Sequence, residues 1–69
     1  MAKKNLIGSE MLIEERRQHV LARIQRDGRA LVGDLSDQLG ISRITIRKDL
    51  EHLQAKGLIQ RTHGGAQAS

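Results

Sequence analysis

Cysteine and all three aromatic residues are absent from this chain of 69 residues. Without cysteine, no disulfide can staple the fold, and no thiolate can bind a metal or act as a nucleophile. Without Phe, Tyr or Trp, the protein has no aromatic cage and no platform on which unpaired bases could stack. The core must therefore be aliphatic, built from the Leu, Ile, Val, Met and Ala residues that make up 38% of the sequence.

Long apolar runs are missing as well, since the longest span two or three residues, as at 11–13 and 30–32. The sequence therefore predicts no transmembrane span and no signal peptide, which favours the cytoplasm. A domain of this size buries only about 60% of its unfolded surface, which leaves little room for a substrate pocket. The sequence has no nucleophile–base pair, and its three histidines match no metal-ligand spacing: His19, His52 and His63. We expect no enzyme, no cofactor and no metal.

Acidic residues are fewer than basic residues. The chain has 12 Lys and Arg against 8 Asp and Glu, a net charge of +4. A small basic domain suggests an anionic partner, either nucleic acid or, less often, a membrane surface. Because charged residues make up 29% and the apolar content is ordinary, the chain is not predicted to be disordered.

The first half of the chain predicts an arm and a helix. Residues 1–8 show no period and are expected to form a flexible N-terminal arm, followed by one domain over 9–69. Ser9 is expected to cap a helix from Glu10 to Asp27. Its apolar residues follow helical spacing: Ile13, Val20, Leu21 and Ile24. Its arginines lie largely on the wetter face and are interpreted as solvent-facing: Arg16, Arg17, Arg23 and Arg26.

The second half predicts two more helices and a hairpin. Residues 30–32 suit a brief strand, and a short helix follows over 33–39. After Gly40, Ser42 is a good cap for a third helix that ends at Gly57. Its apolar residues at i, i+4 and i+7 form a buried stripe: Ile46, Leu50 and Leu53. Residues 58–62 suit a strand, 63–65 a turn, and 66–69 a return strand. The predicted fold class is mainly α with a small β-wing.

A short helix, a tight turn containing glycine and a longer helix form a helix-turn-helix pattern. Residues 41–48 contain three cations and no acid: Arg43, Arg47 and Lys48. This is the part that a recognition helix presents to the major groove of DNA. Arg43 and Arg47 share a face and could take guanine edges or phosphate. Ser42 lies at a helix N-terminus, which itself attracts anions, and Ile44 could contact a thymine methyl group.

Three segments resemble the DeoR-type bacterial repressors: Glu15–His19, Ile41–Leu50 and Gly57–Ala66. The resemblance covers about residues 13–67. It implies a three-helix winged helix-turn-helix domain that binds operator DNA in front of carbohydrate-metabolism genes. It also implies a larger C-terminal domain, absent from this chain, that binds a sugar phosphate and supports homo-oligomers. The chain is therefore expected to be part of a longer regulator.

The resemblance carries roles only at matching positions. Ser42, Thr45, Arg47 and Lys48 match the recognition helix, while Arg61, His63, Gly64 and Gly65 match the wing. Arg43 and Ile44 occupy variable positions, where operator preference is expected to reside. Leu31 and Gly33 depart from the family pattern, which often has a small polar cap and an acidic residue there.

The same residues also have purely structural interpretations. The basic residues could form a solvated helix face, Ser42 and Thr45 could serve only the helix start, and Ile44 and His63 could be ordinary surface residues. Arg16 and Arg17 could reach phosphate. The alternative function is a winged helix that binds another protein, although such domains usually lack basic clusters on the third helix.

Overall fold

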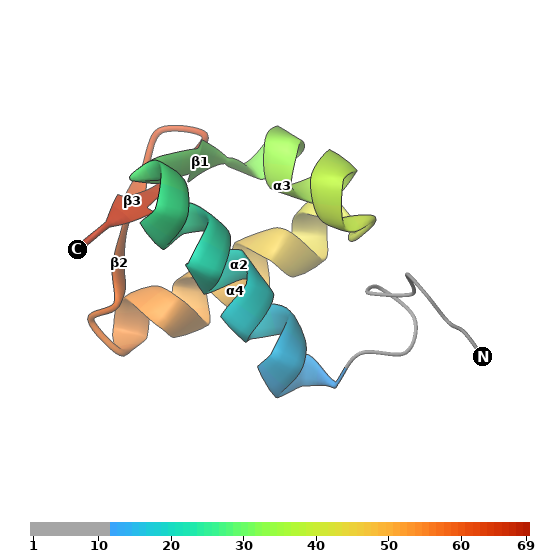
Figure 1. Cartoon of the computed structure of the whole chain (residues 1–69), viewed down its shortest axis with the longest axis horizontal. Coiled ribbons are helices and arrows are strands. Elements are labelled where there is room, and N and C mark those ends of the chain that lie inside the picture. Colours follow the sequence, from blue (N-terminus) through green and yellow to red (C-terminus); the bar gives the residue numbers. More distant parts are fainter. Residues whose placement is uncertain (1–11) are drawn as a thin grey trace.

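The computed structural model describes residues 12–69. The order of elements is α2 (Ile13–Asp27), β1 (Arg29–Leu31), α3 (Val32–Leu39), α4 (Arg43–Ala55), β2 (Ile59–Thr62) and β3 (Gly65–Ala68). The three strands gather at the end of the molecule where α2 and α4 finish (Figure 1). This is the predicted arrangement of three helices and a small β-wing, which is hereafter β2, the turn at 63–64 and β3.

The start of the first helix differs from the prediction. Helix α2 begins at Ile13 rather than Glu10, because the backbone of Leu12 is extended (φ −67°, ψ 156°). The Leu12 N–H donates to Glu15 Oε1 at 3.3 Å, so a glutamate side chain satisfies one of the N–H groups left free at this end. The expected cap Ser9 and the expected arm at 1–8 lie outside the described residues.

The core is aliphatic, as the composition requires. It combines residues from all three helices and the sheet: Val20, Ile24, Val32, Leu35, Leu39, Ile41, Ile46, Leu50, Leu53, Ile59 and Ala66. The predicted stripe of α4 is confirmed, since Ile46 and Leu50 are fully buried and Leu53 is 4% exposed. Ile13 departs from the pattern of α2, because it lies one turn beyond the packed part of the helix and is exposed.

The sheet is antiparallel, with strand order β1-β3-β2. Ala30 pairs with Ala66, and Arg61 pairs with Ala66 from the other side. Gly65 allows the closest approach in this sheet, since a β-carbon there would lie 2.1 Å from the carbonyl oxygen of Ala30. Only glycine therefore lets β3 pair with β1 at this point.

Within the described residues, no helix is both long enough and apolar enough to cross a membrane. The longest, α2, has 15 residues and includes charged side chains towards both of its ends.

Ile46→Asp tests the inward face of α4. A carboxylate at this fully buried position would have no partner among aliphatic side chains. The domain should lose cooperative thermal melting, measured by circular dichroism, since small domains have only about 5 kcal/mol of stability. Ile44→Asp, two residues earlier and exposed, is the matched control and should melt like the parent. Parent-like melting of Ile46→Asp would show that the faces of α4 are wrongly assigned.

Candidate nucleic-acid interface

The turn between α3 and α4 holds the two helices in a fixed relation. Gly40 ends α3 in the left-handed region (φ 68°), which glycine adopts without strain, and its N–H donates to Ser36 O. The Ser36 hydroxyl donates to Ile41 O at 2.5 Å, and Ile41 itself is buried. The turn is therefore anchored in the core on both sides, as a helix-turn-helix requires.

The start of α4 has the predicted cap. Ser42 Oγ accepts a hydrogen bond from the Thr45 N–H at 3.2 Å, and the Ser42 hydroxyl donates to Thr45 Oγ1 at 3.0 Å. The two hydroxyls are thus tied to each other at the helix N-terminus. Both serve the helix start, while the expected anion contact at Ser42 and the expected recognition-helix role of Thr45 stay predictions.

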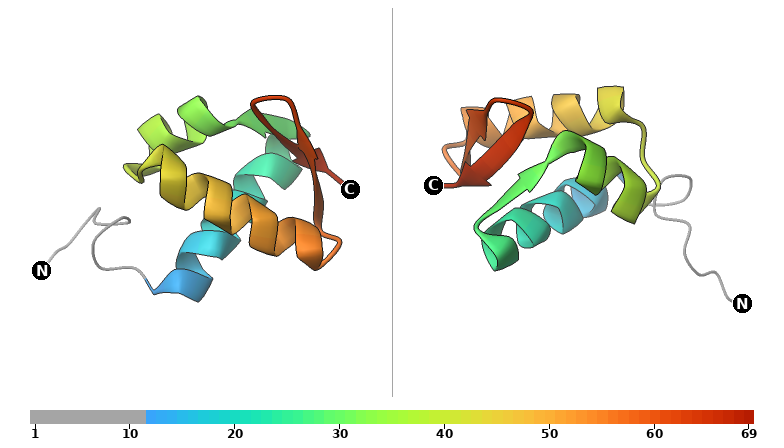
Figure 2. Two further views of the ribbon diagram at one scale, coloured as in Figure 1. Left: turned by 180° about the vertical axis from the view of Figure 1, so that it is seen from behind. Right: turned by 90° about the horizontal axis from the view of Figure 1, so that it is seen from above.

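Beyond the cap, the first two turns of α4 present a basic outer face. Arg43, Ile44, Arg47 and Lys48 are exposed, whereas Ile46 and Asp49 are fully buried. Figure 2 (left) shows α4 in front of α2 with no other element drawn over its outer side. The structure therefore brings four of the predicted DNA-contacting side chains together on an uncovered helix surface.

The positive charge on this face is the opposite of the charge that would stabilise the start of an isolated helix. The N-terminal end of a helix is the positive end of its dipole, where acidic residues stabilise it. The first turn of α4 has no acidic residue and begins instead with Arg43. Cations and the helix dipole thus add up to a local positive field, which suits an anionic ligand.

The wing contributes a second basic group that is partly engaged. Arg61 Nε donates to Gly65 O at 3.2 Å, and the Arg61 backbone N–H donates to Gln54 Oε1 at 2.7 Å. One of the five donors of this guanidinium therefore braces the wing turn. His63 and Gly64 are exposed in that turn, and Gly64 has a positive φ of 80°.

The two halves of the site meet at the first turn of α3. Gly64 O accepts a hydrogen bond from the Val32 N–H at 2.9 Å, which docks the wing turn on the start of α3. The guanidinium of Arg43 lies against Gly33, the next residue. The first turn of α3 thus contacts both the wing and the basic face of α4.

Behind the basic face lies an interaction that the sequence analysis missed. Asp49 is fully buried, and its carboxylate accepts two hydrogen bonds from Arg16, from Nε to Oδ2 and from Nη2 to Oδ1, both at 2.6 Å. Arg17 Nε donates to Oδ1 at 3.2 Å. The spacing of Asp49 could have revealed its burial, because Asp49 stands three residues after Ile46 and directly before Leu50, on the buried stripe.

This corrects the interpretation of Arg16 and Arg17 as solvent-facing. Their side chains are only 15% and 21% exposed, because a buried carboxylate must be paired and these two guanidinium groups pair it. The hydrogen bond to Asp49 raises the pKa of Arg16 above its ordinary value, although burial acts in the opposite direction.

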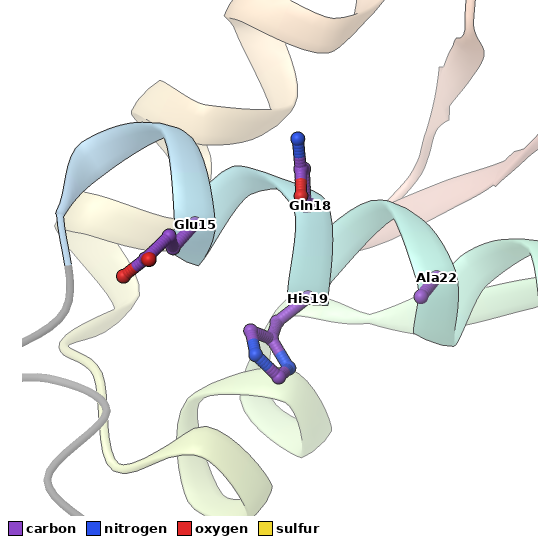
Figure 3. Close-up of a pocket in the computed structure, with 4 residues that line it drawn as sticks. All are labelled: Glu15, Gln18, His19 and Ala22. Atoms are coloured by element: carbon purple, nitrogen blue, oxygen red, sulfur yellow. The ribbon is translucent and has the colours of Figure 1, made fainter.

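An open hollow elsewhere is unrelated to this surface. Glu15, Gln18, His19 and Ala22 line it, and all four belong to α2 (Figure 3). The hollow includes no residue of α4 or of the wing. Within residues 12–69, no three His, Asp or Glu side chains are grouped so that they could hold a metal ion.

The anchored turn, the capped basic helix and the docked wing together define a winged helix-turn-helix domain of the DNA-binding class. The DeoR-like helix-turn-helix domain family matches residues 16–69, and the chain belongs to this family. The resemblance inferred from the sequence is thereby confirmed.

Relatives among curated proteins agree. The chain is 49% identical over 57 residues to the HTH-type transcriptional regulator GlpR of Haloferax volcanii, covering 81% of this chain and 22% of that protein. It is 43% identical over 54 residues to the lactose phosphotransferase system repressor of Lactococcus lactis subsp. lactis, covering 78% and 21%. It is 47% identical over 47 residues to the L-fucose operon activator of Haemophilus influenzae, covering 68% and 19%.

The chain thus spans about a fifth of the length of these relatives. A comparison with solved structures found no match.

Asp49→Asn tests the buried ion pair. The substitution keeps the shape of the side chain but replaces an acceptor by an amide N–H₂ that faces two guanidinium donors. We expect the free energy of unfolding to fall by about 3 kcal/mol, as when one partner of a buried pair is removed. Urea unfolding followed by circular dichroism measures this.

The control for this prediction is Asp27→Asn. Asp27 also binds an arginine through both oxygens, but the Arg26–Asp27 pair is exposed, so its loss should leave the urea midpoint nearly unchanged. Equal effects of the two substitutions would contradict the anchoring role of Asp49.

Proposed function

We propose that this chain is the sequence-specific operator-binding domain of a transcriptional repressor that controls carbohydrate-related genes. The carrying observation is the basic, uncovered face at the start of α4, with three exposed cations and no exposed acid over 43–48. Its opposite side is anchored through Ile46 and Asp49. A helix fixed on one side and basic on the other suits insertion into the major groove.

In the proposed complex, the exposed residues divide into two kinds of contact. Arg43, Arg47 and Ile44 face the base edges, because arginine can bind guanine bidentately and an aliphatic side chain can contact a thymine methyl group. Lys48, Ser42 and Thr45 approach phosphates and set the position of the helix without reading sequence. Arg61, His63 and Gly64 bring the wing to the neighbouring backbone or minor groove.

Repression is the proposed outcome, because a domain that occupies an operator can block transcription by binding DNA alone. The lactose phosphotransferase system repressor among the relatives supports this direction of control. Response to a sugar phosphate and assembly into homo-oligomers are proposed for further parts of a longer protein. The proposed compartment is the cytoplasm, where bacterial and archaeal genomes lie. The proposed function includes no chemical step.

Selection of bound sites from a random duplex pool tests the proposal. A shared motif of a few base pairs in the major groove would support it. Retention of all sequences alike would contradict sequence-specific binding, and failure to retain any duplex would favour the alternative, a winged helix that binds another protein.

Salt dependence checks the phosphate contacts. The logarithm of the association constant should fall linearly with the logarithm of the salt concentration, by about 0.9 for each phosphate neutralised. Fluorescence anisotropy of a labelled duplex between low and physiological salt measures the slope. A flat response would rule out a phosphate-dominated interface.

Arg43→Ala and Lys48→Ala separate base reading from phosphate binding. Arg43→Ala should cost about 1–3 kcal/mol on the selected site and relax preference at one base pair. Lys48→Ala should weaken all duplexes by similar factors and lower the salt slope by about one. The measurement is the affinity of each variant for a panel of single-base changes.

Lys56→Ala is the matched control for these variants, because Lys56 is an exposed cation at the far end of α4. It should leave base preference unchanged. Uniform weakening of every duplex by Arg43→Ala would assign Arg43 to phosphate and move base reading to Arg47, one turn further along the same face.

A further inference from the structure

Gly33 has no backbone reason to be glycine. It lies in the first turn of α3 with ordinary helical geometry, and the positive-φ glycines of the described chain are others: Gly28, Gly40, Gly57 and Gly64. Among common residues, only proline is less favourable than glycine within a helix. The reason for a glycine here must therefore be sought in the space around it.

That space is occupied by the end of the Arg43 side chain. A β-carbon on Gly33 would lie 3.2 Å from Nη2, 3.5 Å from Cζ and 3.8 Å from Nε of Arg43. Three atoms of one guanidinium group thus cover the position that any other residue would fill. The shortest of these distances is tighter than most β-carbon contacts, so the guanidinium must shift by a few tenths of an ångström to admit a β-carbon and further to admit a larger side chain.

The contact restricts Arg43 without using its donors. Among residues 12–69, Arg43 makes no side-chain hydrogen bond and no ion pair, so its guanidinium stays available to DNA. A free arginine side chain has many rotamers, and ordering it on binding weakens affinity. Packing against α3 removes part of this disorder beforehand.

We infer that Gly33 is a positioning residue for Arg43: by lacking a side chain, it seats the guanidinium over the first turn of α3 and sets the direction from which Arg43 approaches DNA. The inference rests on the proposed function, because it assigns the base-reading geometry of Arg43 to a residue on a different helix. The same turn of α3 also holds the wing through Val32 and Gly64. Arg43 is thereby placed relative to the wing as well as to α4.

The test is a double-mutant cycle between positions 33 and 43. Gly33→Leu fills the space occupied by the Arg43 guanidinium with the side chain of a good helix former that carries no charge and no hydrogen-bonding group. In the parent, it should reduce discrimination at the base pair read by Arg43 by about 2- to 12-fold, the factor for immobilising one rotamer-rich side chain. In the Arg43→Ala background, it should change discrimination and overall affinity by less than about twofold. Gly33→Ala should give a smaller effect in the same direction.

Thermal melting separates positioning from a structural role. Both substitutions should raise the melting midpoint, since they replace glycine within a helix. Stability rising while discrimination falls would support the inference. Equal effects of Gly33→Leu with and without the Arg43 side chain, on both discrimination and affinity, would overturn it.

Failure of the proposed base contact of Arg43 can be distinguished from failure of the inference about Gly33. If Arg43→Ala alone leaves base preference unchanged, that role is wrong. The inference then depends on coupling in overall affinity, where zero coupling overturns it and a coupling above twofold supports positioning toward phosphate. In the free protein, a nuclear Overhauser effect between the Gly33 Hα protons and the Arg43 side chain should be present, and its absence would also overturn the inference.

Discussion

A carboxylate sealed among aliphatic side chains is the constraint on which the rest of this structure depends. Left unpaired, the buried charge of Asp49 would cost about 3–5 kcal/mol, which is most of the stability of a domain of this size. Arg16 and Arg17 must therefore lie across α4 at that level, which sets how α2 packs on α4. Because Asp49 follows Arg47 and Lys48 directly, turning it inward turns those two cations outward. One buried ion pair thus orients the basic face.

The local parts of this arrangement could be predicted from the sequence because they obey short-range rules. Apolar spacing identified the inward side of α4, and Ser42 and Gly40 marked the start of α4 and the end of α3. The burial of Asp49 could have been inferred from its spacing on α4, but its partners could not, because they lie 32 and 33 residues away and no periodicity reports such a distance. The hairpin of the wing was also predicted locally, from the apolar residues after Gly57 and the adjacent glycines of the turn, and the resemblance to a known family then gave it a role in DNA binding.

What spacing could not supply was the role of the first turn of α3. As a stretch of sequence it is a weak helix start, with Leu31 in place of a polar cap and no side-chain hydrogen bond there. In the fold, Val32 holds the wing turn and Gly33 accommodates Arg43. Both contacts join segments that are far apart in the chain, so they exist only once the tertiary structure is formed. The element with the least distinctive sequence relates the two halves of the interface.

The order of the strands has a consequence for how the domain is made. β3 follows every other described element in the chain, yet it is the central strand of the sheet, and β1 and β2 each pair only with it. A ribosome releases the chain from its N-terminus, so β1 and β2 emerge with no strand to pair with. The helices can begin to pack during synthesis, whereas the sheet must wait until Gly65–Ala68 have left the exit tunnel. The first turn of α3 gains its hydrogen bond to Gly64 at the same late moment, so the proposed DNA-binding surface is completed only when translation has passed the wing.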